Sequence, residues 1–346
     1  MKEKILEVKN LYVSFDTYAG EVQAIRDLSF EVHRGETLAI VGESGSGKSV
    51  TVQTIMKLIP MPPGRIKSGE ILFEGIDLVK ASPKKMRELR GGKIGMIFQD
   101  PMTSLNPTMK IGKQIMEGIL QHKKVTKVEA KRLSIEMLEK VGIPKPKERF
   151  NQYPHEFSGG MRQRVVIAIA LAAEPDLLIC DEPTTALDVT VQAQIINLID
   201  ELKKEMNIGV ILITHDLGVV AETADRVVVM YAGEKMEEAN VVDLFYDPKH
   251  PYTWGLLESL PRLDMDSNER LKAIQGTPPD LLNPPKGDPF APRSDYAMVI
   301  DYEKEPPITD LGNNHYVKSW LYVDGAPKID PPFKLKKKTE FSKEEK

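Results

Sequence analysis

The chain of 346 residues is long enough for one large or two small domains, and its 41% hydrophobic and 28% charged residues are typical of a globular protein with a packed core. The net charge of −4 argues against a general nucleic-acid-binding protein, and the single cysteine, Cys180, excludes an intrachain disulfide and favours a reducing compartment. We expect no signal peptide, and no membrane span either, because the apolar run 165–173 is far shorter than the roughly 20 residues that a span requires.

The first part of the chain is predicted to be rich in strands. Alternating apolar and polar residues indicate strands over 4–15 and 22–33. A short apolar strand at 37–41 leads into a glycine-rich loop, and a helix should follow over about 47–58. Prolines and glycines in 60–75 favour turns with short strands.

The middle of the chain is predicted to alternate between helices and strands. Helical periodicity covers 109–142, and an apolar helix is expected at 161–173. Buried strands at 177–181 and 210–214 flank a helix at about 191–206. This alternation predicts an α/β fold, with a mostly parallel sheet covered by helices on both faces.

Prolines become frequent after about residue 245, which indicates a change of domain. We predict a first domain over 1–245, a small irregular C-terminal domain over 246–325, and a charged, frayed tail over 326–346.

A phosphate-binding loop is the most specific motif. The pattern G-x-x-x-x-G-K-S stands between a predicted strand and a predicted helix, which is the context that this motif requires. Its backbone N–H groups and the helix N-terminus should bind nucleotide phosphates, Lys48 should reach the β- and γ-phosphates, and Ser49 should supply an oxygen to Mg²⁺. The predicted nucleotide-binding residues of the loop are Gly42, Glu43, Ser44, Gly45, Ser46, Gly47, Lys48 and Ser49.

Two carboxylates end the predicted strand 177–181. Asp181 suits Mg²⁺ coordination through water, and Glu182 is placed to polarise an attacking water as general base. Alone, such a pair would as readily be a helix cap or a solvated acidic pair, but beside a phosphate loop the catalytic interpretation is favoured.

A Ser-Gly-Gly turn, Ser158, Gly159 and Gly160, opens the apolar helix and forms a second potential anion site. The segment Phe157–Arg164 resembles the signature motif of the ATP-binding cassette (ABC) ATPases, although Met161 stands where the family usually has glutamine. The resemblance implies that ATP binds between two cassettes, with this turn facing the γ-phosphate held by the other subunit.

Other positions of the resemblance follow in order. Gln99 matches the glutamine that touches Mg²⁺ and the lytic water, and Asp188, in Ala186-Leu187-Asp188, matches the loop that crosses the dimer interface. His215 matches the histidine that contacts the γ-phosphate, whereas a lone histidine after a strand is usually structural. Phe15 lies where the family places a ring against adenine; the alternative is an ordinary core residue. The resemblance covers about residues 4–245 and implies a phosphate-loop core, an antiparallel β subdomain and a helical subdomain.

Two further segments narrow the resemblance to the ATPases of oligopeptide and dipeptide permeases. These are Gln99–Pro107 and His250–Trp254 with the leucines that follow. The resemblance implies a peripheral protein at the cytoplasmic face of the cell membrane that hydrolyses ATP to drive peptide import. Its implied partners are a second ABC ATPase, with a heterodimer favoured, two transmembrane permease subunits and an extracellular solute-binding protein, with no nucleic acid. Alternatives are an importer for nickel, glutathione or short sugars, or a soluble ABC ATPase outside transport.

Many members of that group hold an iron–sulfur cluster on four cysteines of the C-terminal domain. The corresponding positions here are Asp288, Ser294, Asp301 and Ser319. Because such clusters need thiolate ligands, we expect ATP and Mg²⁺ as the ligands of this chain and no iron–sulfur cluster.

Overall fold

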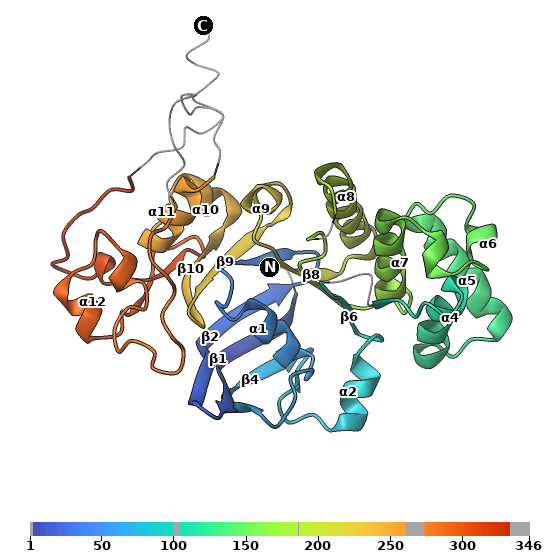
Figure 1. Ribbon diagram of the computed structural model, residues 1–346, viewed down its shortest axis with the longest axis horizontal. Helices are drawn as coiled ribbons and strands as arrows, with labels where there is room; N and C mark the ends of the chain where they lie inside the picture. The colour runs from blue at the N-terminus through green and yellow to red at the C-terminus, as the bar shows by residue number, and fades with distance from the viewer. Residues whose placement is uncertain (1–2, 100–103, 186, 261–272, 333–346) are drawn as a thin grey trace, which may run out of the picture.

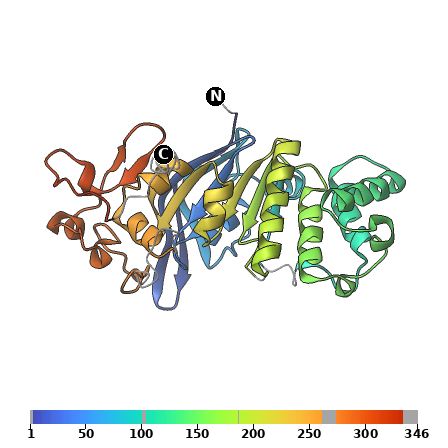
Figure 2. The same cartoon turned by 90° about the horizontal axis from the view of Figure 1, so that it is seen from above.

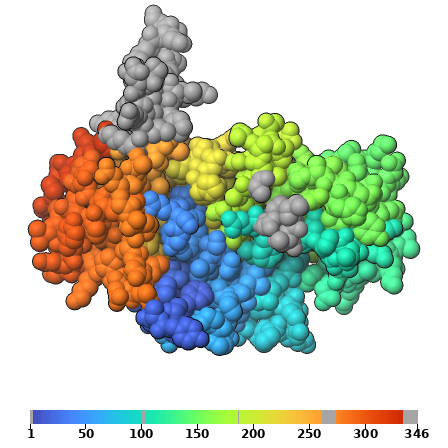
Figure 3. Space-filling model, in the orientation of Figure 1, coloured from blue at the N-terminus to red at the C-terminus, as the bar shows by residue number. Residues whose placement is uncertain are grey.

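The computed structural model describes residues 3–99, 104–185, 187–260 and 273–332. Three parts lie in a row: a central core, a helical subdomain (α4 to α7) at one end and a C-terminal region, 246–332, at the other (Figure 1). The space-filling view has the same elongated outline (Figure 3). The part of the chain that is described contains no helix long and apolar enough to cross a membrane.

A sheet of eight strands runs through the core in the order β11-β12-β10-β9-β3-β8-β7-β6. Its parallel strands are short, apolar and almost completely buried, as expected for strands with both faces covered. They are β3 (Thr37–Val41), β6 (Ile94–Ile97), β7 (Leu177–Asp181), β8 (Gly209–Ile213) and β9 (Arg226–Tyr231).

The C-terminal region extends this same sheet. Strand β10 (Glu234–Asn240) pairs antiparallel with β9, and the hairpin of β11 (Ile308–Asp310) and β12 (Tyr316–Lys318) pairs with β10. The hairpin is therefore joined to the core by backbone hydrogen bonds, although some 70 residues separate β10 from β11 along the chain.

A second, antiparallel sheet lies against the core in the order β2-β1-β4-β5. Its strands are β1 (Lys4–Thr17), β2 (Gly20–His33), β4 (Gly64–Phe73) and β5 (Ile76–Asp77). The alternating apolar side chains of β1 and β2 pack with α1 (Lys48–Ile55) and the core strands in one buried cluster. Strand β4 is longer than the short strands predicted for 60–75, because its pairing with β1 accommodates Gly69 at a register shift.

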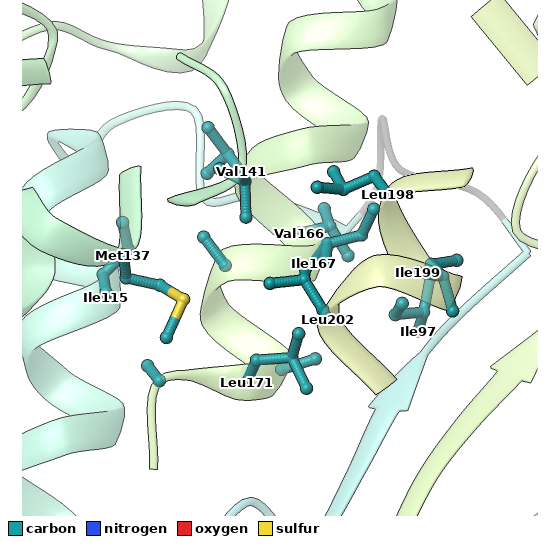
Figure 4. Close-up of a cluster of buried hydrophobic side chains, with 14 of the residues drawn as sticks. Ile97, Ile115, Met137, Val141, Val166, Ile167, Leu171, Leu198, Ile199 and Leu202 are labelled. Carbon is teal, nitrogen blue, oxygen red and sulfur yellow. The ribbon is translucent and has the colours of Figure 1, made fainter. Parts of the chain in front are cut away.

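The helical subdomain is held by a separate apolar cluster that reaches the β6 edge of the sheet (Figure 4). The helical stretch predicted at 109–142 is two helices, because Thr126 caps a new helix by accepting a hydrogen bond from Glu129 N–H. The helices of this end are α4 (Ile111–His122), α5 (Lys127–Lys140), α6 (Pro146–Arg149), α7 (Gly159–Leu171) and the adjoining α8 (Val189–Met206).

Viewed from above, the helical subdomain and the C-terminal region flank the strands of the core (Figure 2). Short helices and 3₁₀ turns complete the fold. They are α2 (Pro83–Leu89), α9 (Leu217–Thr223), α10 (Val241–Tyr246), α11 (Pro251–Glu258), α12 (Val299–Glu303), η1 (Pro154–Glu156), η2 (Ala291–Arg293) and η3 (Trp320–Tyr322). The predicted α/β class, with its parallel core, antiparallel sheet and helical part, is confirmed.

Candidate nucleotide site

The phosphate loop joins the end of β3 to the start of α1 and requires glycine at both of its tight points. Gly42 has φ +146°, and a Cβ there would lie 2.0 Å from the carbonyl oxygen of Met230. Gly47, with φ +97°, is the N-cap of α1. Ser44 and Gly45 at the crest of the loop are exposed, so this part faces the space where phosphates would bind.

Lys48 lies inside the loop. Its side chain is buried, and Nζ donates hydrogen bonds to the carbonyl oxygens of Gly42 (2.8 Å) and Glu43 (2.9 Å). Burial lowers the pKa of the ammonium group, while the negative charges of Glu182, Asp181 and Glu43 oppose that shift. The backbone of the loop thus surrounds the ammonium group of Lys48.

Ser49 and Asp181 bring two oxygens together at the foot of the loop. Ser49 Oγ donates to Asp181 Oδ1 at 2.9 Å, and Asp181 is buried at the end of β7. Burial raises the pKa of Asp181, and the hydrogen bond from Ser49 opposes the rise. A hydroxyl and a carboxylate are oxygen ligands of the kind that Mg²⁺ prefers, so the residues fit this ion.

Glu182 is the centre of a second group. Its Oε2 accepts hydrogen bonds from Gln99 Nε2 (2.9 Å) and Thr185 Oγ1 (3.0 Å), and its Oε1 lies 3.8 Å from Nδ1 of the exposed His215. The backbone of Glu182 is in the left-handed region at φ +48°, an uncommon conformation for a non-glycine residue. Three candidate catalytic residues, from different parts of the chain, therefore converge beside Asp181.

The signature turn and Asp188 lie next to each other, at the adjoining ends of α7 and α8. Ser158 caps α7 by accepting from Met161 N–H (3.4 Å), and Asp188 caps α8 by accepting from Val191 N–H (3.0 Å). A Cβ on Gly160 would lie 2.8 Å from Val191 Cγ1, so glycine permits this close approach. The roles of these residues across a dimer remain predictions.

Phe15 is half-buried on β1, where it packs against the apolar cluster below the antiparallel sheet. Its Cε1 is 3.1 Å from the position of a Cβ on Gly64. Both interpretations of this ring, core residue and adenine contact, stay open. The residues 100–103, Ala186 and Pro261, which carried parts of the resemblance, lie outside the described residues.

Sequence reasoning missed two residues that hold the phosphate loop from outside. The Tyr252 hydroxyl accepts a hydrogen bond from the Glu43 N–H at 2.8 Å, and Arg293 forms a two-pronged ion pair with the Glu43 carboxylate. Tyr252 belongs to a segment that the sequence already marks, but no local pattern connects either residue with a loop more than 200 positions away.

The positions at which the resemblance places cysteines carry oxygen side chains that accept backbone hydrogen bonds nearby. Asp288 accepts from Phe290 N–H and Ser294 from Tyr296 N–H. Asp301 accepts from Met298 N–H and Ser319 from Leu321 N–H. Each oxygen stabilises a turn of its own chain segment, and none is a thiolate, so the residues present do not fit an iron–sulfur cluster.

A phosphate loop, an acidic strand end that faces it, and a Ser-Gly-Gly turn at the start of a neighbouring helix together define an ATP-binding cassette. Residues 25–185 match the family model described as ABC transporter, and residues 236–300 match the model described as oligopeptide/dipeptide transporter, C-terminal region.

Curated relatives extend the similarity over nearly the whole chain. The chain is 65% identical to the oligopeptide transport ATP-binding protein OppD of Bacillus subtilis, across 97% of this chain and 94% of that protein. It is 56% identical to the dipeptide transport ATP-binding protein DppD of Lactococcus lactis, across 95% and 94%. The chain belongs to this family of ATP-binding proteins of oligopeptide and dipeptide transport, and the resemblance seen in the sequence is confirmed.

Solved structures agree on the cassette. A dimeric ATP-binding cassette in a post-hydrolysis state, bound to ADP and Pi, is 26% identical with a TM-score of 0.61, and the match covers 68% of this chain and 98% of that one. The cassette cbiO1 from Clostridium perfringens is 31% identical with a TM-score of 0.61, across 70% and 91%. The predicted ATPase class is confirmed by these similarities.

Proposed function

We propose that this chain hydrolyses ATP to energise oligopeptide uptake, as a peripheral subunit at the cytoplasmic face of the cell membrane. It works with a second cassette in a heterodimer, two transmembrane permease subunits and an extracellular solute-binding protein. The observation that carries the hydrolytic part is the convergence of Gln99 and His215 on Glu182, next to the Ser49–Asp181 pair. The similarity to oligopeptide and dipeptide transport ATP-binding proteins supports the peptide substrate.

In the proposed mechanism the loop amides and Lys48 bind the phosphates of ATP, and Ser49, Gln99 and, through water, Asp181 would hold Mg²⁺. The ion, when bound, neutralises charge on the transferred phosphoryl group. Glu182 accepts the proton of the attacking water, while Gln99 orients the carboxylate and the water. In this proposal His215, whose exposed side chain lies beside Glu182, contacts the γ-phosphate and stabilises the developing charge.

The same site needs a second chain. In our proposal Ser158, Gly159 and Gly160 of one cassette close on the γ-phosphate held by the other, and Asp188 contacts the facing subunit. Phe15 stacks against adenine. The helix caps made by Ser158 and Asp188 in the single chain keep the starts of α7 and α8 rigid before closure.

We further propose that the C-terminal region folds without an iron–sulfur cluster. The support is chemical: the four candidate positions bear carboxylates and hydroxyls that are engaged with backbone N–H groups. Iron and sulfide analysis of anaerobically purified protein tests this, and stoichiometric iron and sulfide would contradict it.

Glu182→Gln tests the catalytic assignment. The variant keeps the shape and one hydrogen-bond acceptor of the side chain but loses the base, so we expect ATP turnover to fall by about 100-fold or more. ATP binding should persist, and the two-cassette complex should stay closed in size-exclusion chromatography with ATP. Turnover near the wild-type rate would contradict the assignment of the base, and retention of uptake for labelled oligopeptides in a strain carrying the variant would contradict the transport role.

A further inference from the structure

The C-terminal region binds Glu43 of the phosphate loop through both its backbone and its side chain. The Glu43 N–H donates to Tyr252 Oη at 2.8 Å. The carboxylate receives Arg293 Nη1 on Oε2 at 2.6 Å and Nη2 on Oε1 at 3.0 Å. From the other side, Lys48 Nζ donates to the Glu43 carbonyl oxygen. The backbone of Glu43 is thus held between Lys48, inside the loop, and the C-terminal region.

Arg293 is itself fixed by every nitrogen of its guanidinium group. Nε donates to the carbonyl oxygen of Gln275 (2.8 Å), Nη2 also to that of Ile274 (3.3 Å), and Nη1 also to Tyr231 Oη (3.0 Å). Its side chain is only 5% exposed. A planar, fully bonded guanidinium in a buried site is a rigid partner, so it defines the position of Glu43 rather than following it.

An aromatic cluster supports Tyr252 and Arg293, the two residues that bind Glu43. The ring centroids of Tyr231 and Tyr252 are 4.6 Å apart, and that of Phe290 lies 5.4 Å from Tyr231 and 5.2 Å from Tyr252. Tyr231 ends β9, next to Met230, whose carbonyl excludes any side chain at Gly42. The outer wall of the phosphate loop is therefore built from the core strand and the C-terminal region together.

Charge gives this arrangement a functional consequence. Glu43 places a carboxylate in a loop that must surround anionic phosphates, and an unneutralised carboxylate there repels them. Arg293 cancels that charge through its bidentate ion pair with the carboxylate. We propose that Arg293 and Tyr252 are positioning residues for ATP binding, which hold Glu43, and with it the phosphate loop, in the shape that closes around Lys48. This rests on the nucleotide-binding role of the loop within the proposed function.

Reciprocity follows from this link. If the C-terminal region stabilises the ATP-binding shape of the loop, bound ATP must stabilise the docking of the C-terminal region by the same free energy. Hydrogen exchange across residues 288–294 of the full-length chain should therefore slow when ATP is added. Exchange that ATP leaves unchanged in wild-type protein would overturn the coupling.

The central test is the ATP dissociation constant of the full-length Arg293→Gln variant, measured by titration calorimetry, with the KM and kcat of the assembled importer. We expect affinity to fall by about tenfold, within the usual range for coupled sites, and KM to rise while kcat changes less than about twofold. Arg293→Lys should lie between the variant and wild type, because an ammonium group restores charge but not the two-pronged geometry. Tyr252→Phe should weaken binding by about threefold, as it removes one acceptor and keeps the ring.

Matched variants separate positioning from loss of folding. Lys318→Gln breaks a buried ion pair with Glu234 in the same region, without touching the loop, and Tyr322→Phe removes a hydroxyl that donates to Lys249. Both should bind ATP as wild type does. If Lys318→Gln weakened ATP binding as much as Arg293→Gln at equal thermal stability, general loosening of the region would explain the effect and the proposal would fall.

A double variant tests whether Arg293 acts through Glu43. Adding Glu43→Gln to Arg293→Gln should give no further loss, because the two changes remove one interaction, and should restore the part of the affinity that repulsion by the unneutralised Glu43 carboxylate costs. Additive losses would overturn the proposed route. Lys48→Ala distinguishes the two levels of inference: if it loses ATP while Arg293→Gln binds normally, only the positioning role is wrong, whereas normal binding by Lys48→Ala contradicts the nucleotide site itself.

Discussion

The helical subdomain and the C-terminal region are attached to opposite ends of one sheet by different kinds of contact. Beside β6, the helices pack through side chains such as Ile97, Ile167 and Leu171, in a continuous apolar cluster (Figure 4). Beside β10, the C-terminal hairpin is bonded strand to strand, a buried ion pair joins Lys318 to Glu234 (2.6 Å), and a buried hydrogen bond joins His315 Nε2 to Glu237 Oε1 (2.7 Å).

The two kinds of contact differ in how strongly their energy depends on direction. Apolar contacts have no preferred direction, so packed helices can slide by small amounts at little cost. Hydrogen bonds and buried ion pairs lose their energy when the geometry changes, so they fix register. Gln99 lies at the start of the connection to the helical subdomain, and Glu43 is held by the C-terminal region. Glu182, the proposed general base, is thus bonded to Gln99 on the side of the apolar attachment, and the phosphate loop is bonded to the side held by hydrogen bonds and ion pairs.

The largest effect is expected from removing the same side chain on each side. Leu171→Ala in α7 and Leu257→Ala in α11 both truncate almost fully buried leucines, so each should lower the free energy of unfolding by about 2–5 kcal/mol. Only Leu257→Ala should also weaken ATP binding, because α11 carries Tyr252. Chemical denaturation and ATP titration, both below the unfolding range, measure the two quantities.

Equal losses of ATP affinity in the two leucine variants would contradict the expected difference between the two regions. It would mean that the phosphate loop responds to general loosening and not to the contacts of the C-terminal region. A loss of ATP affinity in Leu171→Ala alone would mean that the phosphate loop responds to the helical subdomain and not to the C-terminal region.

A pH-dependent effect of smaller size is expected at Asp288. Burial raises its pKa to about 6 from 3.8; His250 Nε2 lies 3.7 Å from its Oδ2, and the charges of Lys318 and Asp301 also act nearby. A carboxyl whose pKa is raised on folding stabilises the protein below about pH 4 and loses that contribution as the pH rises through 6. Asp288→Asn should therefore stabilise the protein at pH 8 by up to about 3 kcal/mol and have little effect at pH 4.

Unfolding curves of the two proteins at both pH values test this expectation. His250, whose pKa burial lowers to about 4, is present in both, so its contribution largely cancels in the difference. Asp310→Asn is the matched control, because the exposed Asp310 makes the same kind of turn bond, to Gly312 N–H. A gain that is equal at pH 4 and pH 8 would contradict the assignment of the titrating group.

The smallest change in stability is expected at the signature turn. Ser158→Ala removes a long cap bond of 3.4 Å, so the free energy of unfolding should fall by about 0.5–1 kcal/mol. ATP affinity of the single chain should not change, whereas ATPase activity of the assembled importer should fall. Thr126→Ala, which removes the equivalent cap of α5, should have the first effect and not the second. A turnover of Ser158→Ala equal to that of Thr126→Ala would place the serine outside the shared site.

The parts of the site that the sequence predicted are those defined by short spacings. Three motifs each occupy a few consecutive residues, so their chemistry can be recognised without knowledge of the fold: the phosphate loop, the strand that ends in Asp181 and Glu182, and the turn at Ser158. The α/β class followed from the alternation of apolar strands and helices for the same reason. Gln99 and His215 needed the ordered resemblance, because a single glutamine or histidine carries no local pattern.

What the sequence could not predict depends on contacts between distant segments. Arg293 lies 250 residues from Glu43, in a proline-rich stretch without periodicity, and only the folded chain brings the two together. The C-terminal hairpin was missed because β11 and β12 are each three residues long, which is too short for an alternating pattern to be recognised in the sequence. The sequence shows that cysteine is absent from the four positions. It does not show that the oxygen side chain at each position accepts a hydrogen bond from a backbone N–H of a neighbouring turn.

Because the core sheet continues into the β11–β12 hairpin, the position at which the chain is truncated matters for the cassette. A shortened chain ending near Tyr246 would retain β10 but lose its neighbour, and so present an unpaired strand edge, which is a template for aggregation. It would also leave Glu237, completely buried here, without His315 and without the backbone donors of Lys249 and His250. The match to the ABC family model ends at residue 185, yet the eight-stranded core sheet of this chain continues to Lys318.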